Sequence, residues 1–70
     1  MNTQNDRLLE YLKTHDSITQ LEALNELGIF RLASRVNDLK KRGFDISGRM
    51  IFVRNRFDEE IRVKEYFLNL

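Results

Sequence analysis

The sequence has no cysteine, three glycines and one histidine. Without cysteine the chain forms no disulfide and offers no thiolate to a metal, which fits a reducing compartment. So few glycines together with 41% hydrophobic residues are unlike a disordered tail. No run approaches the ~18 consecutive apolar residues of a membrane span, and the N-terminus lacks the basic start and apolar stretch of a secretory signal. We therefore expect a folded, cytoplasmic protein.

Seventy residues correspond to one domain, which we expect to span 1–70 because the chain has no repeat, low-complexity stretch or linker. A chain this short buries only roughly 60% of its unfolded surface, so its stability margin is small. A core of this size also leaves little room for an effector pocket.

The few chemically reactive residues argue against an enzyme. The sequence has no glycine-rich phosphate loop and neither HExxH nor GxSxG spacing. His15 falls at a helix end, where we expect it to cap carbonyl groups or face solvent. Acidic residues are scattered, with no pair at metal-binding spacing beside a second ligand type. We therefore predict no catalysis, metal, cofactor or small-molecule substrate.

Charge is unevenly distributed along the chain, although its net value is only +1. Residues 1–28 carry two basic and five acidic side chains, residues 29–56 eight and two, and residues 57–70 two and four. A basic middle segment between acidic flanks is typical of a protein with one surface for a polyanion. Chance clustering of solvated charges is the alternative.

The first third of the chain predicts one helix and a short extended piece. Thr3 can cap a helix that runs to about Thr14. The apolar face of this helix consists of Leu8, Leu9 and Leu12. Beyond the helix, Ile18 is the lone apolar residue of an extended stretch.

A second, short helix follows. Thr19 and Glu22 form a capping box, in which hydroxyl and carboxylate satisfy reciprocal backbone donors. Gly28 ends the helix, because a glycine just past the last periodic residue adopts the left-handed conformation that closes a helix. We expect Ala23 to allow close packing and the leucines of this helix to point inward, namely Leu21, Leu24 and Leu27.

A third helix, over about 30–42, begins near Phe30 and is closed by Gly43. Its inward stripe recurs at i, i+4 and i+7 and consists of Leu32, Val36 and Leu39, with Ala33 beside it. Because only Gly28 and Ile29 separate the second and third helices, the two meet at a tight corner, which is a helix-turn-helix.

Beyond Gly43 the hydrophobic period changes from 3.6 to 2, which predicts strands over 45–53 and 61–68 with a polar turn over 54–60. Ile46, Met50 and Phe52 share one face of the first strand, and Ile61, Val63 and Phe67 one face of the second. The chain is therefore predicted to be an α+β domain in which a C-terminal β-hairpin covers the open side of a three-helix core.

The third helix presents an outward face with the chemistry of a major-groove reader. Arginine makes paired bonds to guanine, asparagine to adenine, and serine to either. The basic C-terminal end suits phosphates and complements the helix dipole. The outward stripes consist of Phe30, Ser34, Asn37 and Lys41 and of Arg31, Asp38 and Arg42, with Arg35 at the edge.

Ordinary surface salt bridges are the alternative for this face. Asp38 is spaced to pair with Arg42 at i+4 or with Arg35 at i−3. Phe30 also has a second role open to it, which is to pack the turn against the core instead of touching bases.

The spacing of these elements resembles the winged helix-turn-helix domains of small phage and bacterial DNA-binding proteins over about 5–68. In those domains the third helix ends in a basic run, a glycine, an aromatic residue and an isoleucine that lead into the wing hairpin. The matching residues here are Leu27-Gly28-Ile29, then Leu32, Val36 and Leu39, then Lys40-Lys41-Arg42-Gly43-Phe44-Asp45-Ile46, and in the closing strand Glu65-Tyr66-Phe67-Leu68. Simple three-helix repressors usually bury a branched residue where this chain has Ser34, so the match is to the winged branch.

This resemblance implies that the third helix enters the major groove and that the wing touches an adjacent backbone or minor groove. The DNA-binding residues are then Arg31, Ser34, Arg35 and Asn37 for bases, Lys41 for phosphate, Arg54, Asn55 and Arg56 in the wing, and Phe30 and Arg42 beside them. Arginines at a loop tip suit a narrow minor groove. The alternative for the wing is pairing within the hairpin tip, with Asp58, Glu59 and Glu60.

We accordingly expect a double-stranded DNA-binding protein that regulates transcription in a phage or bacterium and lies on the nucleoid when bound. The apolar residues 66–70 invite a partner, and we expect them to support a homodimer with two reading helices for a pseudo-palindromic site. The main alternative is a protein-interaction module on the same scaffold, for example a phage protein that binds a host complex. RNA binding ranks below both, since no aromatic stacking platform is evident.

Overall fold

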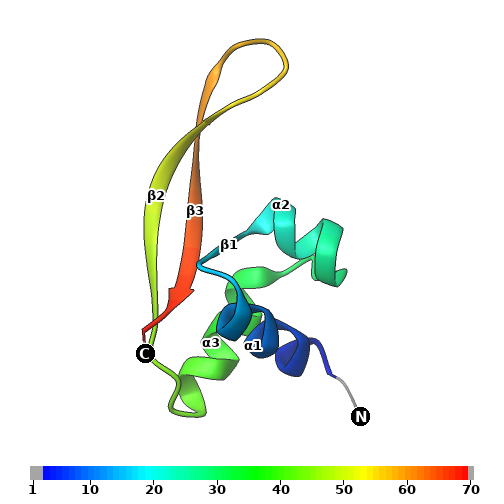
Figure 1. The fold of residues 1–70 in the computed structure, drawn as a ribbon, viewed down its shortest axis with the longest axis vertical. Helices are drawn as coiled ribbons and strands as arrows, with labels where there is room; N and C mark the ends of the chain where they lie inside the picture. The colour runs from blue at the N-terminus through cyan, green and yellow to red at the C-terminus, as the bar shows by residue number, and fades with distance from the viewer. Residues whose placement is uncertain (1–2, 70) are drawn as a thin grey trace.

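A computed structural model describes residues 3–69 and has the expected order of elements: helix, short strand, helix, helix, strand, strand (Figure 1). In chain order these are α1 (Gln4–Thr14), β1 (Ile18–Thr19), α2 (Gln20–Glu22), the π-helical turn η1 (Ala23–Leu27), α3 (Leu32–Lys41), β2 (Ile46–Arg54) and β3 (Glu60–Leu68). The predicted α+β architecture with a C-terminal hairpin is confirmed. Within the described residues, no helix has the length and apolar character needed to cross a membrane.

Capping boxes start the first two helices. The Thr3 hydroxyl accepts a hydrogen bond from the Asp6 backbone N–H at 3.2 Å, and the Asp6 carboxylate accepts one from the Thr3 N–H at 3.3 Å. Thr19 and Glu22 form the same reciprocal pair at 3.3 and 3.0 Å. Each box satisfies backbone donors that a helix leaves without a partner in its first turn. Both predicted helix starts are therefore confirmed.

Two glycines with positive φ close the helices of the corner, as expected. Gly28 has φ +68° and donates its N–H to the carbonyl of Leu24, while Ile29 donates to that of Ala23. Gly43 has φ +98° and follows α3. Left-handed backbone is a conformation that residues with a Cβ adopt only at a cost, which explains glycine at both positions.

The expectation that Leu21 and Leu24 point inward is wrong. Leu21 is 66% exposed and Leu24 also lies on the surface, whereas Ala23 is fully buried and Leu27 is half-buried. The rotation of this helix is fixed by Gln20, whose amide donates to the Ile29 carbonyl at 2.8 Å and accepts from the Leu32 N–H at 3.0 Å. With Gln20 facing α3, the leucines that follow it turn outward.

The same glutamine explains where α3 begins. Because its side-chain oxygen holds the Leu32 N–H, the helix starts at Leu32 and not near Phe30. Arg31 precedes it with φ −117° and ψ 70°, outside the helical region. The inward stripe of α3 is as predicted, with Leu32, Val36 and Leu39 buried, while Ala33 is exposed.

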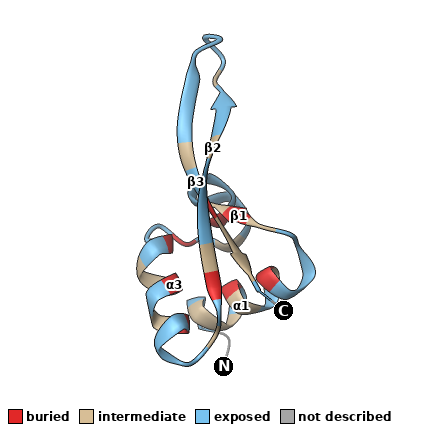
Figure 2. Cartoon of the chain, turned by 90° about the vertical axis from the view of Figure 1, so that its left-hand side faces the viewer, coloured by how far each residue is buried: buried red, intermediate tan, exposed pale blue. Residues whose placement is uncertain are grey.

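The core is formed between the helices and the base of the sheet (Figure 2). It consists of Leu8, Leu12, Ile18, Ala23, Ile29, Leu32, Val36, Leu39 and Ile46. Tyr66 and Leu68 pack against it from β3. The part of residues 66–70 that the structure describes is thus largely occupied in packing; Leu70 lies outside the described residues.

The sheet has the strand order β1-β3-β2, and all its pairings are antiparallel. Ile18 lies opposite Tyr66 and Ile46 opposite Leu68, so the base of the sheet lies on the core. The hairpin continues well beyond the helices (Figures 1 and 2), and the molecule measures 40 × 22 × 20 Å. Met50 and Phe52 share the face of Ile46, as expected, but both are exposed. The hairpin covers the core only with its base.

Candidate functional site

The outer side of α3 carries a run of exposed polar and cationic side chains. Arg31 lies directly before the helix, Asn37 lies at its middle and Lys41 at its end, and all three are exposed. Ser34 is half-buried on the same side. The helix therefore presents side chains that can donate and accept hydrogen bonds along its whole length, on the side away from the core.

Arg35 is held by neighbours. Its guanidinium lies 3.3 Å from the Asp38 carboxylate, and the Asn5 amide donates to the same carboxylate at 3.5 Å. The second alternative considered for Asp38, pairing at i−3, is the one that forms. This cluster of Asn5, Arg35 and Asp38 joins α1 to α3, so Arg35 contributes to packing as well as to the outer face.

Arg42 pairs with α1 and not with Asp38. Its guanidinium lies 4.0 Å from the Asp6 carboxylate and 6.0 Å from the centre of the Phe44 ring. The pKa of Asp6 is lowered, chiefly by the hydrogen bond from the Thr3 backbone, then by that from the Thr3 hydroxyl, with Arg42 adding to the effect. Asp6 is therefore ionised near neutral pH and partly offsets the charge of Arg42.

The C-terminal end of α3 remains strongly cationic. Lys40 and Lys41 occupy its last turn and Arg42 caps it, and all three are exposed. Cations at this end interact favourably with the carbonyl end of the helix dipole. The end of α3 thus offers a compact set of positive charges beside the polar side of the helix.

Phe30 does not pack the corner against the core. Its side chain is 77% exposed, and Gln20 performs the joining role through its two hydrogen bonds to Ile29 and Leu32. The expectation of an outward Phe30 is therefore confirmed. Gln20 is a residue that sequence reasoning missed, because its position inside the capping box gives no sign of a contact with α3.

The hairpin tip, residues 54–60, is built from local polar contacts. The Asn55 side chain accepts from the backbone N–H groups of Phe57 and Glu59 at 2.9 and 3.1 Å and donates to the Glu59 carboxylate at 3.1 Å. The Arg54 guanidinium lies 2.9 Å from Asp58 and 3.9 Å from Glu60. The alternative of pairing within the tip is thus realised for Arg54 and Asn55, while Arg56 is exposed.

Further cations lie on the shaft of the hairpin, where sequence reasoning placed none of the site. Arg62 lies opposite Phe52, and Lys64 lies opposite Met50. Both cations are exposed. Residues 57–70 are acidic overall, so the charge count along the sequence did not single out these two cations. The strand register places them on the same face of the hairpin as Arg54.

With this geometry, the comparison with protein families is decisive: the model of the winged helix-turn-helix domain matches residues 3–70. The chain belongs to the winged helix-turn-helix family. The resemblance inferred from the helix corner and the basic run is thereby confirmed. A search of curated proteins finds no match. Membership supports a DNA-binding role in general, in which α3 is the second helix of the helix-turn-helix and the β2–β3 hairpin is the wing.

The single histidine of this winged helix lies at the end of α1. Its ring stacks on that of Tyr11 at a centroid distance of 3.9 Å, and its Nδ1 lies 3.2 Å from the Tyr11 carbonyl oxygen. His15 thus lies against the last turn of α1, in the capping position expected of it. Within residues 3–69 no three histidine or carboxylate side chains are grouped in a way that would hold a metal ion.

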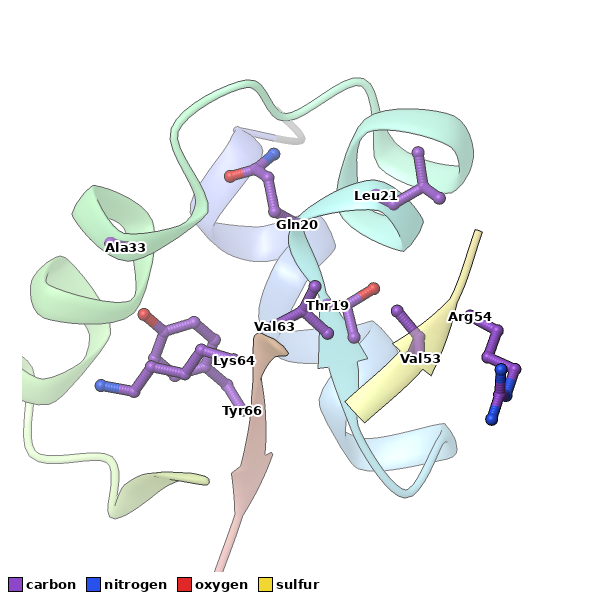
Figure 3. Close-up of a pocket in the computed structure, with 9 residues that line it drawn as sticks. All are labelled: Thr19, Gln20, Leu21, Ala33, Val53, Arg54, Val63, Lys64 and Tyr66. Atoms are coloured by element: carbon purple, nitrogen blue, oxygen red, sulfur yellow. The ribbon is translucent and has the colours of Figure 1, made fainter. Parts of the chain in front are cut away.

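One groove lies between the wing and the helix corner (Figure 3). Its volume is about 370 Å³, and its apolar walls are Leu21 of α2, Ala33 of α3, Val53 of β2 and Val63 and Tyr66 of β3. Arg54 and Lys64 are its charged residues, and among the residues that line it in the described part of the chain none is acidic. We refer to it as the wing groove.

Proposed function

We propose that this winged helix-turn-helix domain binds double-stranded DNA and regulates transcription in a phage or bacterium, with α3 in the major groove. The observation that carries the proposal is the outer side of α3, where Arg31, Asn37 and Lys41 are exposed together. The dimensions of a major groove admit one α-helix, and arginine and asparagine are the side chains that read guanine and adenine there.

The proposed roles follow from position along α3. Arg31, Ser34 and Asn37 contact base edges, and Phe30 offers an apolar contact to a thymine methyl group. Lys41 and Arg42, at the C-terminal end, contact phosphates. Arg35 also reads bases if its guanidinium exchanges Asp38 for DNA, since the two are joined by a half-exposed ion pair of modest strength.

DNA contact by the wing residues Arg54, Asn55 and Arg56 stays a prediction. Two arginines and three carboxylates give residues 54–60 a net charge of −1. A net negative tip is repelled by phosphates, and Arg54 and Asn55 already have partners within it. Arg56 is the wing residue with the best access to DNA.

We further propose that the protein acts as a homodimer in the cytoplasm, on the nucleoid when DNA is bound. Two copies present two α3 helices, which matches a two-fold symmetric site with half-sites one helical turn apart. A two-fold arrangement also doubles the number of phosphate contacts, so affinity rises without any additional residue.

A second candidate function is binding of a partner protein. It is favoured by the apolar side chains that the wing exposes, chiefly Phe52 at 68% and Phe57 at 74% exposure. Exposed aromatic residues of this kind are typical of interaction surfaces. This candidate and the first respond differently to salt, because apolar contacts are little affected by screening whereas phosphate contacts are strongly weakened.

The proposal is tested by selecting bound duplexes from a random library and then measuring fluorescence anisotropy on the selected duplex. We expect Arg31→Ala and Asn37→Ala to lose preference for one base pair each, by about 1–3 kcal/mol. The matched control is Lys13→Ala, which removes an exposed cation from the end of α1. No enrichment of any sequence, with equal binding by all three variants, would contradict the proposal.

A further inference from the structure

The tip of the wing presents an aromatic side chain together with acidic groups. Phe57 is 74% exposed at the turn, and the residues that follow it are Asp58, Glu59 and Glu60. The tip is held in shape by the Asn55 side chain and by Arg54, so this group of side chains is presented by a defined turn. An exposed phenylalanine on a net negative tip suits an apolar site bordered by positive charge.

The wing groove has the complementary character. Its walls are apolar, from Leu21, Val53 and Val63. Its charged residues are the cations Lys64 and Arg54, of which Arg54 is paired with carboxylates of its own tip. Leu21 is 66% exposed although it is a large apolar residue beside the groove. A volume of about 370 Å³ has room for an aromatic side chain. Tip and groove therefore match in polarity, charge and size.

We propose that the wing tip of one copy docks in the wing groove of a second copy and that the second copy does the same in return. Phe57 fills the groove beside the partner's Leu21, and the tip carboxylate of Glu59 meets the partner's Lys64. This inference rests on the homodimer in the proposed function and assigns that homodimer its interface. The wing-tip interface takes the place of the dimer interface expected at residues 66–70, because Tyr66 and Leu68 pack on the core.

The shape of the wing allows two copies to form a closed dimer. The groove extends along the hairpin from Tyr66 to Arg54, the last residue of β2, and Phe57 lies in the turn that follows, so two hairpins that overlap antiparallel at their outer ends bring each tip to the other's groove. An exchange of this kind has two-fold symmetry and leaves no tip or groove open for a third copy. The edge of β3 is also accessible: β1 pairs with it only at Glu65 and Tyr66, and no other strand within residues 3–69 covers that edge over 60–64.

Sedimentation equilibrium without DNA tests the proposal on the full chain. We expect a dimer, and we expect Phe57→Ser to weaken it about a hundredfold, because two phenylalanine side chains lose their apolar contacts in each dimer. Leu21→Ser is expected to weaken it from the groove side. The matched control is Phe52→Ser, which removes a phenylalanine of similar exposure that does not line the groove and leaves the dimer unchanged.

Two further experiments test whether the tip of one copy contacts the groove of the other: mixing two variants, and reversing a pair of charges. A mixture of the Phe57→Ser and Leu21→Ser chains regains one intact contact in each mixed dimer, so it associates more strongly than either variant alone. Glu59→Lys or Lys64→Glu alone weakens the dimer, and the two in one chain restore it, since the reversed charges meet across the interface. Circular dichroism checks that each variant is folded.

A wild-type chain that remains monomeric at high micromolar concentration would overturn the proposal. So would a dimer that Phe57→Ser and Leu21→Ser leave intact, or a charge exchange without restoration. If Phe57→Ser instead abolishes DNA binding and leaves the dimer as it is, the tip is a DNA contact and the docking is wrong. Failure of the DNA-binding function is seen separately, because Arg31→Ala acts on DNA affinity and not on sedimentation.

Discussion

Arg49 on β2 and Glu65 on β3 face one another across the base of the wing and form an ion pair. Glu65 is buried, although it is charged, and its second oxygen accepts a hydrogen bond from the Ser17 hydroxyl at 2.9 Å. Arg49 also lies 5.1 Å from the centre of the Phe67 ring. This cluster ties the segment before β1 to both strands of the wing, so the position of the hairpin depends on a carboxylate.

The cluster predicts that acid weakens the fold. The hydrogen bond from Arg49, and then that from Ser17, hold the pKa of Glu65 below its usual value of 4.5. A carboxylate with a lowered pKa contributes stability above the pKa of the unfolded chain and loses it as the pH falls through the folded pKa. We expect the Tm to fall below about pH 4.5 and the decline to be shallower in Glu65→Gln. Thermal unfolding of both chains from pH 7 to pH 2.5 measures this, and parallel curves would contradict it.

Replacing Gly28 tests the closure of the helix corner. Its φ is +68° and a Cβ built there meets nothing within 4 Å, so the cost of a side chain comes from the backbone alone. We expect Gly28→Ala to lower the free energy of unfolding by about 1–2 kcal/mol. Gly28→Asn is the matched control and costs less, because asparagine tolerates left-handed backbone. Urea unfolding compares both variants with the wild-type chain. Equal stability of all three would show that a side chain at position 28 costs nothing, which would contradict the prediction.

The elements of this fold were predictable because their signals are local. The capping boxes at Thr3 and Thr19 and the glycines at 28 and 43 mark the helix ends in the sequence itself. The rotation of the second helix was not predictable, because it depends on Gln20 reaching residues 29 and 32. A three-leucine pattern gave the wrong face, since a longer-range hydrogen bond decided it.

A pair of leucine substitutions tests that rotation. Leu39 is fully buried, so we expect Leu39→Ala to cost about 2–5 kcal/mol of unfolding free energy. Leu21 is largely exposed, so Leu21→Ala is expected to cost less than about 0.5 kcal/mol. Both are measured by urea unfolding at a dilution where the chain is monomeric. Equal costs would mean that Leu21 lies inward, as its spacing alone suggests.

The two arginines at the start of α3 are expected to behave differently. Arg31 is exposed, so Arg31→Ala leaves the Tm nearly unchanged and weakens DNA binding. Arg35 is joined to Asp38, so Arg35→Ala also lowers stability, by no more than about 1 kcal/mol for a half-exposed pair. Thermal unfolding and anisotropy on the selected duplex separate the two effects. Equal loss of stability in both variants would assign Arg31 a structural role.

The sequence was sufficient to predict which side of α3 forms the site, but not the contacts of its individual residues. The pattern of α3 alone separates inward from outward positions, which is why the exposed set at Arg31, Asn37 and Lys41 agrees with the sequence. Pairing partners were not predictable, because Asn5 and Asp6 approach α3 only through the packing of α1. The positions of Arg62 and Lys64 were not predictable for a related reason, since only the strand register places them on the same face as Arg54.

The central claim is that the cationic end and outer side of α3 meet the DNA backbone. It is tested most directly by the dissociation constant of the selected duplex as a function of salt. With at least three phosphate contacts per chain from Lys40, Lys41 and Arg42, and so six per dimer, we expect affinity to fall roughly 2,000-fold between about 50 and 200 mM salt, and Lys41→Ala to reduce the slope by about 1.8. An affinity that does not change with salt, or a slope that Lys41→Ala leaves unaltered, would contradict the account.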